Sequence, residues 1–556
     1  MKTRYNFFKK IVCASLFTAG ALATTSCDNY LDVNTNPNGP DQVVAPHLYL
    51  PAMQSELALG IQFDSRYLGR YIQNWNARDT DLTWDRHGYV SGSDAAGQLW
   101  RSVYWPMGQN LTDMIDKAAE EERWDFVGVG YVMRAFGWQL LTDYHGEIVV
   151  KQAFEPGRTT FDYDSQEYVY EEVRRLTMLA IENLKRTDGK VGTASTLAQG
   201  DLIYGGDRSK WLRFAYGLLA VNESRLTNKS TFNPDKVIEY VDQALQSNAD
   251  DASVRFEGAV SSDTNFFGPR RGNLNSYRQS KFIVSLLDGT NPVLSDPSLI
   301  GDDPIFAGQH LKDPRLPVML SPANDGQYRG VTPSVGVSEY TVANERPRNL
   351  WNTASDNVAS TTPNKYLFGN NARFPLMTYA QLQFIKAEAA LIKGAKDVAL
   401  DAYTKGVNAH MNFAKTFVTN DATTPEDEVA VFEQRRAEYL ASEKLMPKSA
   451  NELTIRHIML QKYIAQWGWG FIETWSDLRR YHYIENPDGT IDQDPSNNVF
   501  AGFTFPSQFF GVNQGEPAYR FRPRFNSEYM WNVASLDKIG GLAPNYHTVE
   551  IWFSKK

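Results

Sequence analysis

Residues 379–391 read Tyr-Ala-Gln-Leu-Gln-Phe-Ile-Lys-Ala-Glu-Ala-Ala-Leu, and this stretch decides the fold that the sequence predicts. Its apolar side chains recur at the spacing of an α-helix, and Gly394 shortly after it is a typical helix stop. Alanines at positions 380, 387 and 390 keep the side chains small, which lets neighbouring helices approach closely. We therefore predict a helix that packs tightly between other helices.

The same helical periodicity recurs in pairs of segments along most of the chain. Two single amphipathic segments come first, near 47–73 and 95–121. Paired helices at this spacing are typical of tetratricopeptide-like units, although a generic helical bundle would show similar periodicity. The sequence therefore predicts a mainly α-helical fold built from helix pairs. The four predicted pairs are 127–144 with 164–186, 208–228 with 234–247, 376–393 with 397–417, and 427–442 with 450–476.

Three regions interrupt the helical pattern, near 74–92, 256–375 and 484–530. The first is a polar loop between the first two predicted helices, and the other two are rich in glycine, proline, asparagine and serine. Excursions of this length inside a compact protein are usually functional or carry short local structure. We expect all three to pack against one side of the helical scaffold and to form its ligand side.

The N-terminus has the pattern of a secretory signal. The first ten residues carry four cations and no acid, and an apolar run follows from Ile11 to Ala23. A bilayer-spanning helix needs about 20 apolar residues, so this run is too short to remain as a span. We predict a signal peptide over 1–26, lipidation of Cys27, a turn-rich tether over 27–46 and a single domain over 47–556. A plain secretory signal with an incidental cysteine is the alternative.

The composition disfavours several partners. The chain has a formal net charge of −9, and the four cations of the leader leave with it, so the remainder is more acidic. Nucleic acid and anionic membrane surfaces need clusters of lysine and arginine, and we therefore expect no nucleic-acid partner. The two cysteines are Cys13, inside the leader, and Cys27, so the mature chain forms no internal disulfide.

Motifs for catalysis and for metal binding are absent from the sequence. There is no His-Glu-x-x-His, no Gly-x-Ser-x-Gly, no P-loop and no dinucleotide fingerprint. The eight histidines are scattered, and none forms a pair at helical spacing. Carboxylate pairs are harder to judge, because a glycosidase needs only two acids that are close in space. Asp81 and Asp85 beside Trp84 are the most suggestive pair, and they could equally accept hydrogen bonds from sugar hydroxyls. We predict no catalytic residue, no metal site and no cofactor.

Aromatic side chains in polar loops are the better indication of a ligand site. Trp75 and Trp84 lie in a hydrophilic loop with no periodic reason to face a core. A flat aromatic face beside amides and charged groups suits a sugar ring, and the same surface could accept a peptide. Core packing or loop anchoring explains each residue about equally well, because tryptophan is often largely buried. The ligand-binding candidates are Trp75, Asp81, Trp84, Arg86, Tyr277, Tyr340 and Trp351.

Several short motifs, taken in order along the chain, resemble one known family. The predicted mature start reads Cys27-Asp28-Asn29-Tyr30-Leu31-Asp32-Val33-Asn34-Thr35-Asn36-Pro37. Each motif alone is weakly specific, but their shared order resembles the SusD/RagB-like nutrient-binding outer-membrane lipoproteins of Bacteroidetes. The further matches are Arg134-Ala135-Phe136, Leu141-Thr142-Asp143-Tyr144-His145-Gly146, Lys210-Trp211-Leu212-Arg213-Phe214-Ala215, Asp313-Pro314-Arg315-Leu316-Pro317, the 379–390 helix, Gln461-Lys462-Tyr463, Glu473-Thr474-Trp475-Ser476-Asp477-Leu478-Arg479-Arg480 and Arg522-Pro523-Arg524.

The resemblance implies both a fold and a function. Members are lipid-anchored at the cell surface and have tetratricopeptide-like helix pairs in a right-handed superhelical scaffold with long irregular loops. They act as a lid over a SusC-like TonB-dependent β-barrel transporter and capture oligosaccharides or peptides for import. As a rule they have no catalytic activity. We therefore expect an outer-membrane lipoprotein that captures oligosaccharides for such a transporter. A peptide binder, a surface glycosidase or peptidase, and a structural scaffold for the transporter are the alternatives. No ligand-site residue is carried over, because those residues differ between members.

Overall fold

The computed structural model describes residues 44–191, 196–296, 313–356, 358–418, 427–492 and 494–556. The predicted signal peptide, Cys27 and most of the predicted tether lie outside the described residues. The chain divides into one unit of residues 1–45 and another of residues 46–556, and the second unit holds all the elements named below. Within the described part of the chain, no helix has the length and apolarity needed to span a bilayer.

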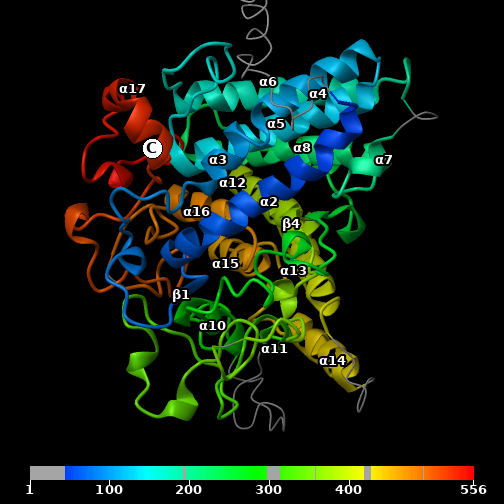
Figure 1. Cartoon of the computed structure of the whole chain (residues 1–556). Helices are drawn as coiled ribbons and strands as arrows, with labels where there is room; N and C mark the ends of the chain where they lie inside the picture. Colours follow the sequence, from blue (N-terminus) through cyan, green and yellow to red (C-terminus); the bar gives the residue numbers. More distant parts are fainter. Residues whose placement is uncertain (1–43, 192–195, 297–312, 357, 419–426, 493) are drawn as a thin grey trace, which may run out of the picture. The chain divides into compact units, whose positions relative to one another are not determined.

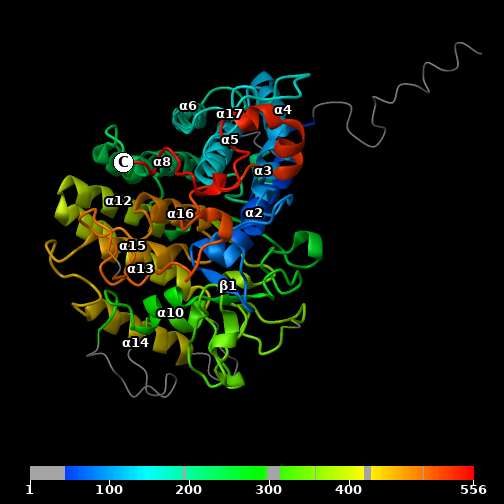
Figure 2. The ribbon, with the colours of Figure 1, turned by 90° about the vertical axis from the view of Figure 1, so that its left-hand side faces the viewer.

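Three predicted helix pairs form one continuous stack. The two helices of each pair pack side by side, and α6 also packs on α8 and α9 on α12. The stack runs from α5, α6 and α8 through α12 to α13 in both views (Figure 1 and Figure 2). The prediction of tetratricopeptide-like helix pairs is confirmed for these segments. The pairs are α5 (Trp124–His145) with α6 (Gln166–Lys185), α8 (Arg208–Ser224) with α9 (Pro234–Gln243), and α12 (Tyr379–Lys393) with α13 (Lys396–Lys415).

Local sequence signals set the ends of these helices. The Thr378 hydroxyl accepts a hydrogen bond from the Gln381 backbone N–H, and the Gln381 side chain accepts one from the Thr378 backbone, which forms a capping box at the start of α12. Gly394 ends α12 at a φ of +83°, a left-handed conformation that costs glycine little. The alanines at 380, 387 and 390 are buried, as the pattern predicts for a helix inside a stack.

Proline and glycine split two segments that the pattern predicts as single helices. The segment near 95–121 forms α3 (Gln98–Tyr104) and α4 (Gly108–Glu120), because Pro106 has no backbone N–H to continue the helix. The Ser102 carbonyl accepts instead from the Met107 N–H at 3.1 Å. The segment 450–476 becomes α15 (Ile455–Gln466) and then α16 (Phe471–Arg480). Gly468 lies in the turn between them at a φ of +86°. Helix α14 (Asp427–Ala441) packs on α13, and α15 packs on α12, α13 and α16.

Two short antiparallel ribbons tie the irregular regions together. Strand β1 (Trp75–Ala77) pairs with β3 (Tyr277–Gln279), so Trp75 lies opposite Gln279 and Ala77 opposite Tyr277. Strand β2 (Ala252–Val254) pairs with β4 (Phe374–Met377). The first ribbon joins two of the predicted irregular regions, which therefore do carry local structure. Four further elements lie near the sites described below: α2 (Pro46–Tyr71), the 3-10 turn η1 (Trp84–Arg86), the π-helical turn η10 (Phe525–Tyr529) and α17 (Val533–Lys538). Three short α-helices lie elsewhere in the chain: α7 (Leu197–Gly200), α10 (Lys281–Asp288) and α11 (Leu316–Met319).

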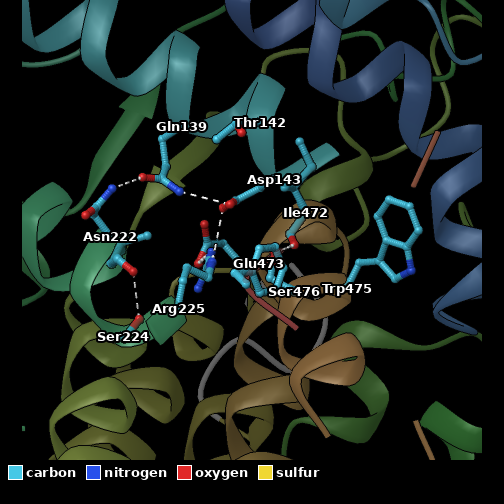
Figure 3. A network of polar contacts seen from close by, with 12 residues as sticks. Gln139, Thr142, Asp143, Asn222, Ser224, Arg225, Ile472, Glu473, Trp475 and Ser476 are labelled. Atoms are coloured by element: carbon cyan, nitrogen blue, oxygen red, sulfur yellow. Dashed lines mark hydrogen bonds and ion pairs between the residues drawn. The ribbon is translucent and has the colours of Figure 1, made fainter. Parts of the chain in front are cut away.

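A network of buried charges lies where α5, α8, α12, α15 and α16 meet. We call it the buried ionic network; its eight side chains are all nearly or fully inaccessible to solvent. Arg225 bridges Asp143 at 3.1 Å and Glu473 at 2.6 Å (Figure 3). Its cations are Arg225, Lys462, Arg479 and Arg480, and its carboxylates are Asp143, Glu388, Glu473 and Asp477.

Charge pairing inside this network offsets the cost of burial. Burial alone would raise the pKa of Asp477, but Lys462 and Arg480 outweigh it and hold the pKa below its usual value. The Lys462 Nζ atom is 2.8 Å from Asp477, and Arg480 reaches Asp477 and Glu388 at 2.7 Å each. A carboxylate without such partners would be strongly destabilising in this position. The network therefore favours one relative placement of the helices that supply it.

Candidate functional site

Two of the predicted ligand residues are core residues. The Trp75 side chain has no exposed surface, and its ring centroid lies 5.8 Å from that of Phe267 and 5.1 Å from that of Phe471. Trp351 is 2% exposed, and its indole N–H donates to the Phe267 carbonyl at 2.8 Å. These positions correct the prediction that both indoles present a face to a ligand. The physical reason for Trp75 is that pairing of β1 with β3 carries this strand into the core, where its polar neighbours Asn74 and Asn76 are buried as well.

Asp81 and Tyr340 hold their own loops in place. Asp81 accepts backbone hydrogen bonds from Thr83 at 2.9 Å and from Asp85 at 3.2 Å, which stabilises the turn η1. Burial would raise the pKa of Asp81, but Arg70 at 2.7 Å and the backbone donors keep it below its usual value. The Tyr340 hydroxyl donates to the Gly330 carbonyl at 2.6 Å. Both side chains are half-buried, so they keep part of their surface accessible.

Arg86 and Tyr277 are the other half-buried candidates. The Arg86 guanidinium donates to the Gln508 side chain at 3.2 Å, and the Tyr277 ring lies 6.0 Å from the Arg70 guanidinium carbon. The β1–β3 ribbon brings Tyr277 close to the 74–92 loop, as the predicted ligand side requires. A contact of Asp81, Arg86, Tyr277 or Tyr340 with a ligand stays a prediction.

Trp84 is the predicted residue that lines a cavity. The cavity has a volume of about 350 Å³ and lies between the segment that follows η1 and the C-terminal segment 521–547. We call it the aromatic cavity. Pockets that bind small molecules are of this size and are lined by aromatic groups with a few convergent polar ones. The aromatic and polar residues used below are Tyr71, Trp84, Tyr89, Asp94, Phe521, Arg522, Arg524, Phe525, Tyr529 and His547.

The floor of the aromatic cavity is a stack of buried rings. The Phe521 ring stacks on Tyr71 with a centroid distance of 5.0 Å and on Tyr144 at 4.4 Å. Trp84 stacks on Phe521 at 6.2 Å, and the Tyr71 hydroxyl donates to the Gly88 carbonyl. Aromatic pairs in such arrangements add about 0.5–1.5 kcal/mol each beyond their buried area. The floor is therefore preorganised, because α2, α5 and the C-terminal segment hold its rings in place.

One wall of the cavity is an arginine held between two tyrosines. The Arg522 guanidinium carbon lies 4.4 Å from the Tyr89 ring centroid and 5.1 Å from that of Tyr529. The Arg522 Nε–H donates to the Tyr529 hydroxyl at 2.9 Å, and an Nη2–H donates to the Gly541 carbonyl at 3.1 Å. Tyr89 and Tyr529 therefore have fixed orientations. The π-helical turn η10 contributes here as well, since it stacks Phe525 on Tyr529 at 5.6 Å.

An ion pair also lines the cavity, and the histidine of the cavity is neutral. Arg524 bridges Asp94 at 2.5 Å, and Asp94 also accepts from the Asn526 backbone at 2.8 Å. Burial, with a smaller contribution from Arg522, lowers the pKa of His547 to about 4. At neutral pH the charges that line the aromatic cavity are therefore Arg522, Arg524 and Asp94. Among the described residues, no group of three or more histidine, cysteine and acidic side chains is arranged to hold a metal ion.

The sequence pattern missed most of this site. Tyr89 lies in the predicted 74–92 region and Arg522 in the predicted 484–530 region, but neither was singled out as a ligand residue. Arginines flanking Pro523, followed by Phe525, are the signal that could have indicated it. Arg522 and Tyr89 are in contact although they are 433 positions apart in the sequence, and no local sequence pattern predicts such a contact.

Comparison with known proteins assigns the chain to a family. Residues 37–300 and 303–506 match the model of a SusD-like family that is described as starch-binding and associating with the outer membrane. The chain belongs to this SusD-like family. No curated protein sequence matches this SusD-like protein.

Solved structures share the fold of this SusD-like protein. A SusD/RagB family protein from Bacteroides thetaiotaomicron aligns with a TM-score of 0.61 at 22% identity, over 92% of this chain and 99% of its own. A SusD homologue from Parabacteroides distasonis gives 0.63 at 18% identity, over 91% and 98%. A chitin-binding SusD homologue from Flavobacterium johnsoniae gives 0.61 at 18% identity, over 92% and 97%. At these identities the likeness shows the fold, which confirms the predicted mainly α-helical SusD-like architecture.

Proposed function

We propose that this SusD-like protein captures oligosaccharides in the aromatic cavity and passes them to a SusC-like TonB-dependent β-barrel transporter. The observation that carries the proposal is the pairing of a preorganised ring floor with the Tyr89–Arg522–Tyr529 wall. A sugar ring stacks its C–H face on aromatic rings while its hydroxyls take hydrogen bonds from groups such as Arg522, Arg524 and Asp94. The family description and the chitin-binding homologue support a carbohydrate as the ligand class.

We infer that the protein binds its ligand without cleaving it. A glycosidase places two carboxylates on either side of the scissile bond, within about 5–10 Å of each other. Asp94 is the one acidic residue among those that line the aromatic cavity in the described part of the chain, and Arg524 pairs with it. This lining supports capture rather than hydrolysis.

The proposed place of action is the cell surface, with the protein anchored in the outer membrane through lipid on Cys27. The leader pattern before Cys27 and the family description of outer-membrane association support this proposal. Copurification of a large β-barrel protein from native membranes is the expected result. Its absence after mild solubilisation would count against the transporter partner.

The capture proposal is tested with the protein extracted from membranes in detergent. Binding of maltotriose and chitotriose is measured by calorimetry for the wild type, Tyr89→Ala and Trp531→Ala. Trp531 is the aromatic control because it is 76% exposed and does not line the aromatic cavity. We expect about a tenfold loss of affinity for Tyr89→Ala, since one aromatic contact contributes about 1 kcal/mol or slightly more. Equal affinity of all three proteins would refute this site, and binding of peptides in place of both sugars would favour the peptide alternative.

A further inference from the structure

A second cavity of about 290 Å³ adjoins the aromatic cavity, and Arg524 lines both of them. We call it the α3 cavity. Helix α3 and the residue after it supply Trp100, Arg101, Tyr104 and Trp105, and the turn η10 supplies Ser527 and Glu528. In both ribbon views the C-terminal segment with α17 lies beside α3 (Figure 1 and Figure 2).

Trp105 is exposed in a way that packing does not explain. Its side chain is 69% exposed, whereas Trp100 on the same helix is 3% exposed. The Arg101 guanidinium carbon lies 4.6 Å from the Trp105 ring centroid and covers one face of the indole. Tyr104 holds the 149 segment in place instead: its hydroxyl donates to the Val149 carbonyl at 2.7 Å and accepts from the Val149 N–H at 3.0 Å. The indole face that Arg101 leaves uncovered is open at the edge of the α3 cavity, and a sugar ring stacks its C–H face on such a surface.

Polar groups surround this indole. Among the described residues, the Arg101 guanidinium has no hydrogen bond and no ion pair, and it lies over the Trp105 ring. In the described part of the chain, the Ser527 hydroxyl at this cavity is buried and has no hydrogen-bond partner. Glu528 is already used, since its carboxylate accepts from Tyr163 at 2.6 Å and from Asn532 at 3.0 Å. Arg101 is therefore the polar group beside the indole that remains available to a ligand.

Arg524 is the residue that the linings of the two cavities share. Its side chain is 23% exposed, and the ion pair with Asp94 fixes its position. The two cavities are therefore close enough for one oligosaccharide to be considered in both.

We propose that the α3 cavity is a second sugar subsite, in which a further sugar of the same oligosaccharide stacks on the free face of Trp105. Its hydroxyls take hydrogen bonds from the Arg101 guanidinium, which makes no hydrogen bond among the described residues and lies over the opposite face of the indole. The inference rests on the proposed capture of oligosaccharides and goes beyond it, because it makes chain length a determinant of affinity. The preferred ligand is therefore an oligosaccharide long enough to span both cavities rather than a di- or trisaccharide.

The test compares short and long sugars on the same membrane-extracted protein. Maltotriose is measured against maltohexaose, and chitotriose against chitohexaose, for the wild type, Trp105→Ala, Tyr89→Ala and the exposed control Trp531→Ala. For at least one of the two series we expect the wild type to bind the hexasaccharide about tenfold more tightly than the trisaccharide, through one more stacking contact. Trp105→Ala should bring the hexasaccharide affinity down to that of the trisaccharide, whereas Trp531→Ala behaves as the wild type. Tyr89→Ala should weaken both lengths.

Each result other than the expected one refutes a specific part of the proposals. A length advantage that survives in Trp105→Ala refutes the subsite, and so does equal wild-type affinity for both lengths; in both cases the aromatic cavity stands as proposed. Absence of wild-type binding to all four sugars refutes the capture of these glycans and the subsite together. Loss of both lengths in Trp105→Ala with normal thermal unfolding would place the first sugar at Trp105 and refute the assignment of the aromatic cavity.

Discussion

The buried ionic network and the aromatic cavity both use arginine, and they use it in opposite ways. In the network Arg225 and Arg480 are inaccessible to solvent and each reaches two carboxylates. At the cavity Arg522 lies between two tyrosine rings and donates to both tyrosine hydroxyls and to two backbone carbonyls. A buried cation that is paired with two carboxylates favours one packing of helices, whereas a cation packed on rings leaves polar and aromatic surface open to a ligand.

Helix α16 connects the two regions. Its Asp477 and Arg480 belong to the network, while its Trp475 packs on Phe521 in the cavity floor at a centroid distance of 5.2 Å. Between them, Arg479 lies 3.8 Å from the Trp475 centroid and donates to the Asp143 and Tyr519 carbonyls at 2.6 and 2.8 Å. One helix therefore stabilises the fold through one set of side chains and supports the rings of the proposed ligand site with another.

The largest effect is expected from Asp477→Ala, which leaves Lys462 unpaired and Arg480 with Glu388 alone. Removing one partner of a buried ion pair costs about 3–5 kcal/mol, so the free energy of unfolding should fall by this amount. Urea unfolding followed by circular dichroism measures it. The double variant Lys462→Met/Asp477→Leu removes one cation and one carboxylate together and should be the more stable of the two. An unchanged unfolding midpoint in Asp477→Ala would show that the buried ionic network does not stabilise the fold.

An intermediate effect is expected from Arg522→Leu, which should lower both the stability of the fold and the affinity for the ligand. Stability should fall by about 1–2 kcal/mol, because ring contacts and charged hydrogen bonds of a partly exposed cation are lost. Oligosaccharide affinity should fall about tenfold as Tyr89 and Tyr529 lose their common support. The matched control is Arg186→Leu, since Arg186 also lies over an indole, 3.6 Å from the Trp124 centroid, and lines no cavity named here. Equal affinity loss in both variants would contradict the site.

The smallest effect is expected from His482→Gln, at the link between α16 and the C-terminal segment. Hydrogen bonds to Glu485 at 2.7 Å and to Glu550 at 3.1 Å raise the pKa of His482 from 6.5 to about 9. Because the folded-state pKa is the higher one, this stabilisation is complete below pH 6.5 and is lost as the pH rises through 9. We expect a difference of about 1 kcal/mol or less, because solvent screens this half-exposed group.

The measurement for His482 is the thermal unfolding midpoint of both proteins between pH 6 and pH 10, read as the difference between them. The difference is needed because burial raises the pKa of Asp64 and of Asp251 to about 7, so the wild type has other pH dependence in this range. A difference that is constant with pH would show that His482 does not contribute through its charge.

Local patterns predicted the helices well, because the features that form a helix lie within a few residues of each other. The capping box at Thr378, the stop at Gly394 and the buried alanines of α12 are all visible in the sequence. The pattern failed at 450–476, where the apolar spacing continues through a turn that Gly468 allows. It also failed for Trp75 and Trp351, because a tryptophan in a polar loop has no periodicity that reports its burial.

The sequence by itself determined the helix pairs, the acidic charge and the family-like order of motifs, since each depends on residue type and short spacing. The tertiary structure alone decided where the aromatic cavity, the proposed ligand site, lies. Trp75 is buried because β1 meets a strand that is about 200 residues away in sequence, and the aromatic cavity exists because Arg522 meets Tyr89 across 433 positions. Contacts of this range depend on how the whole chain packs, and no local spacing encodes them.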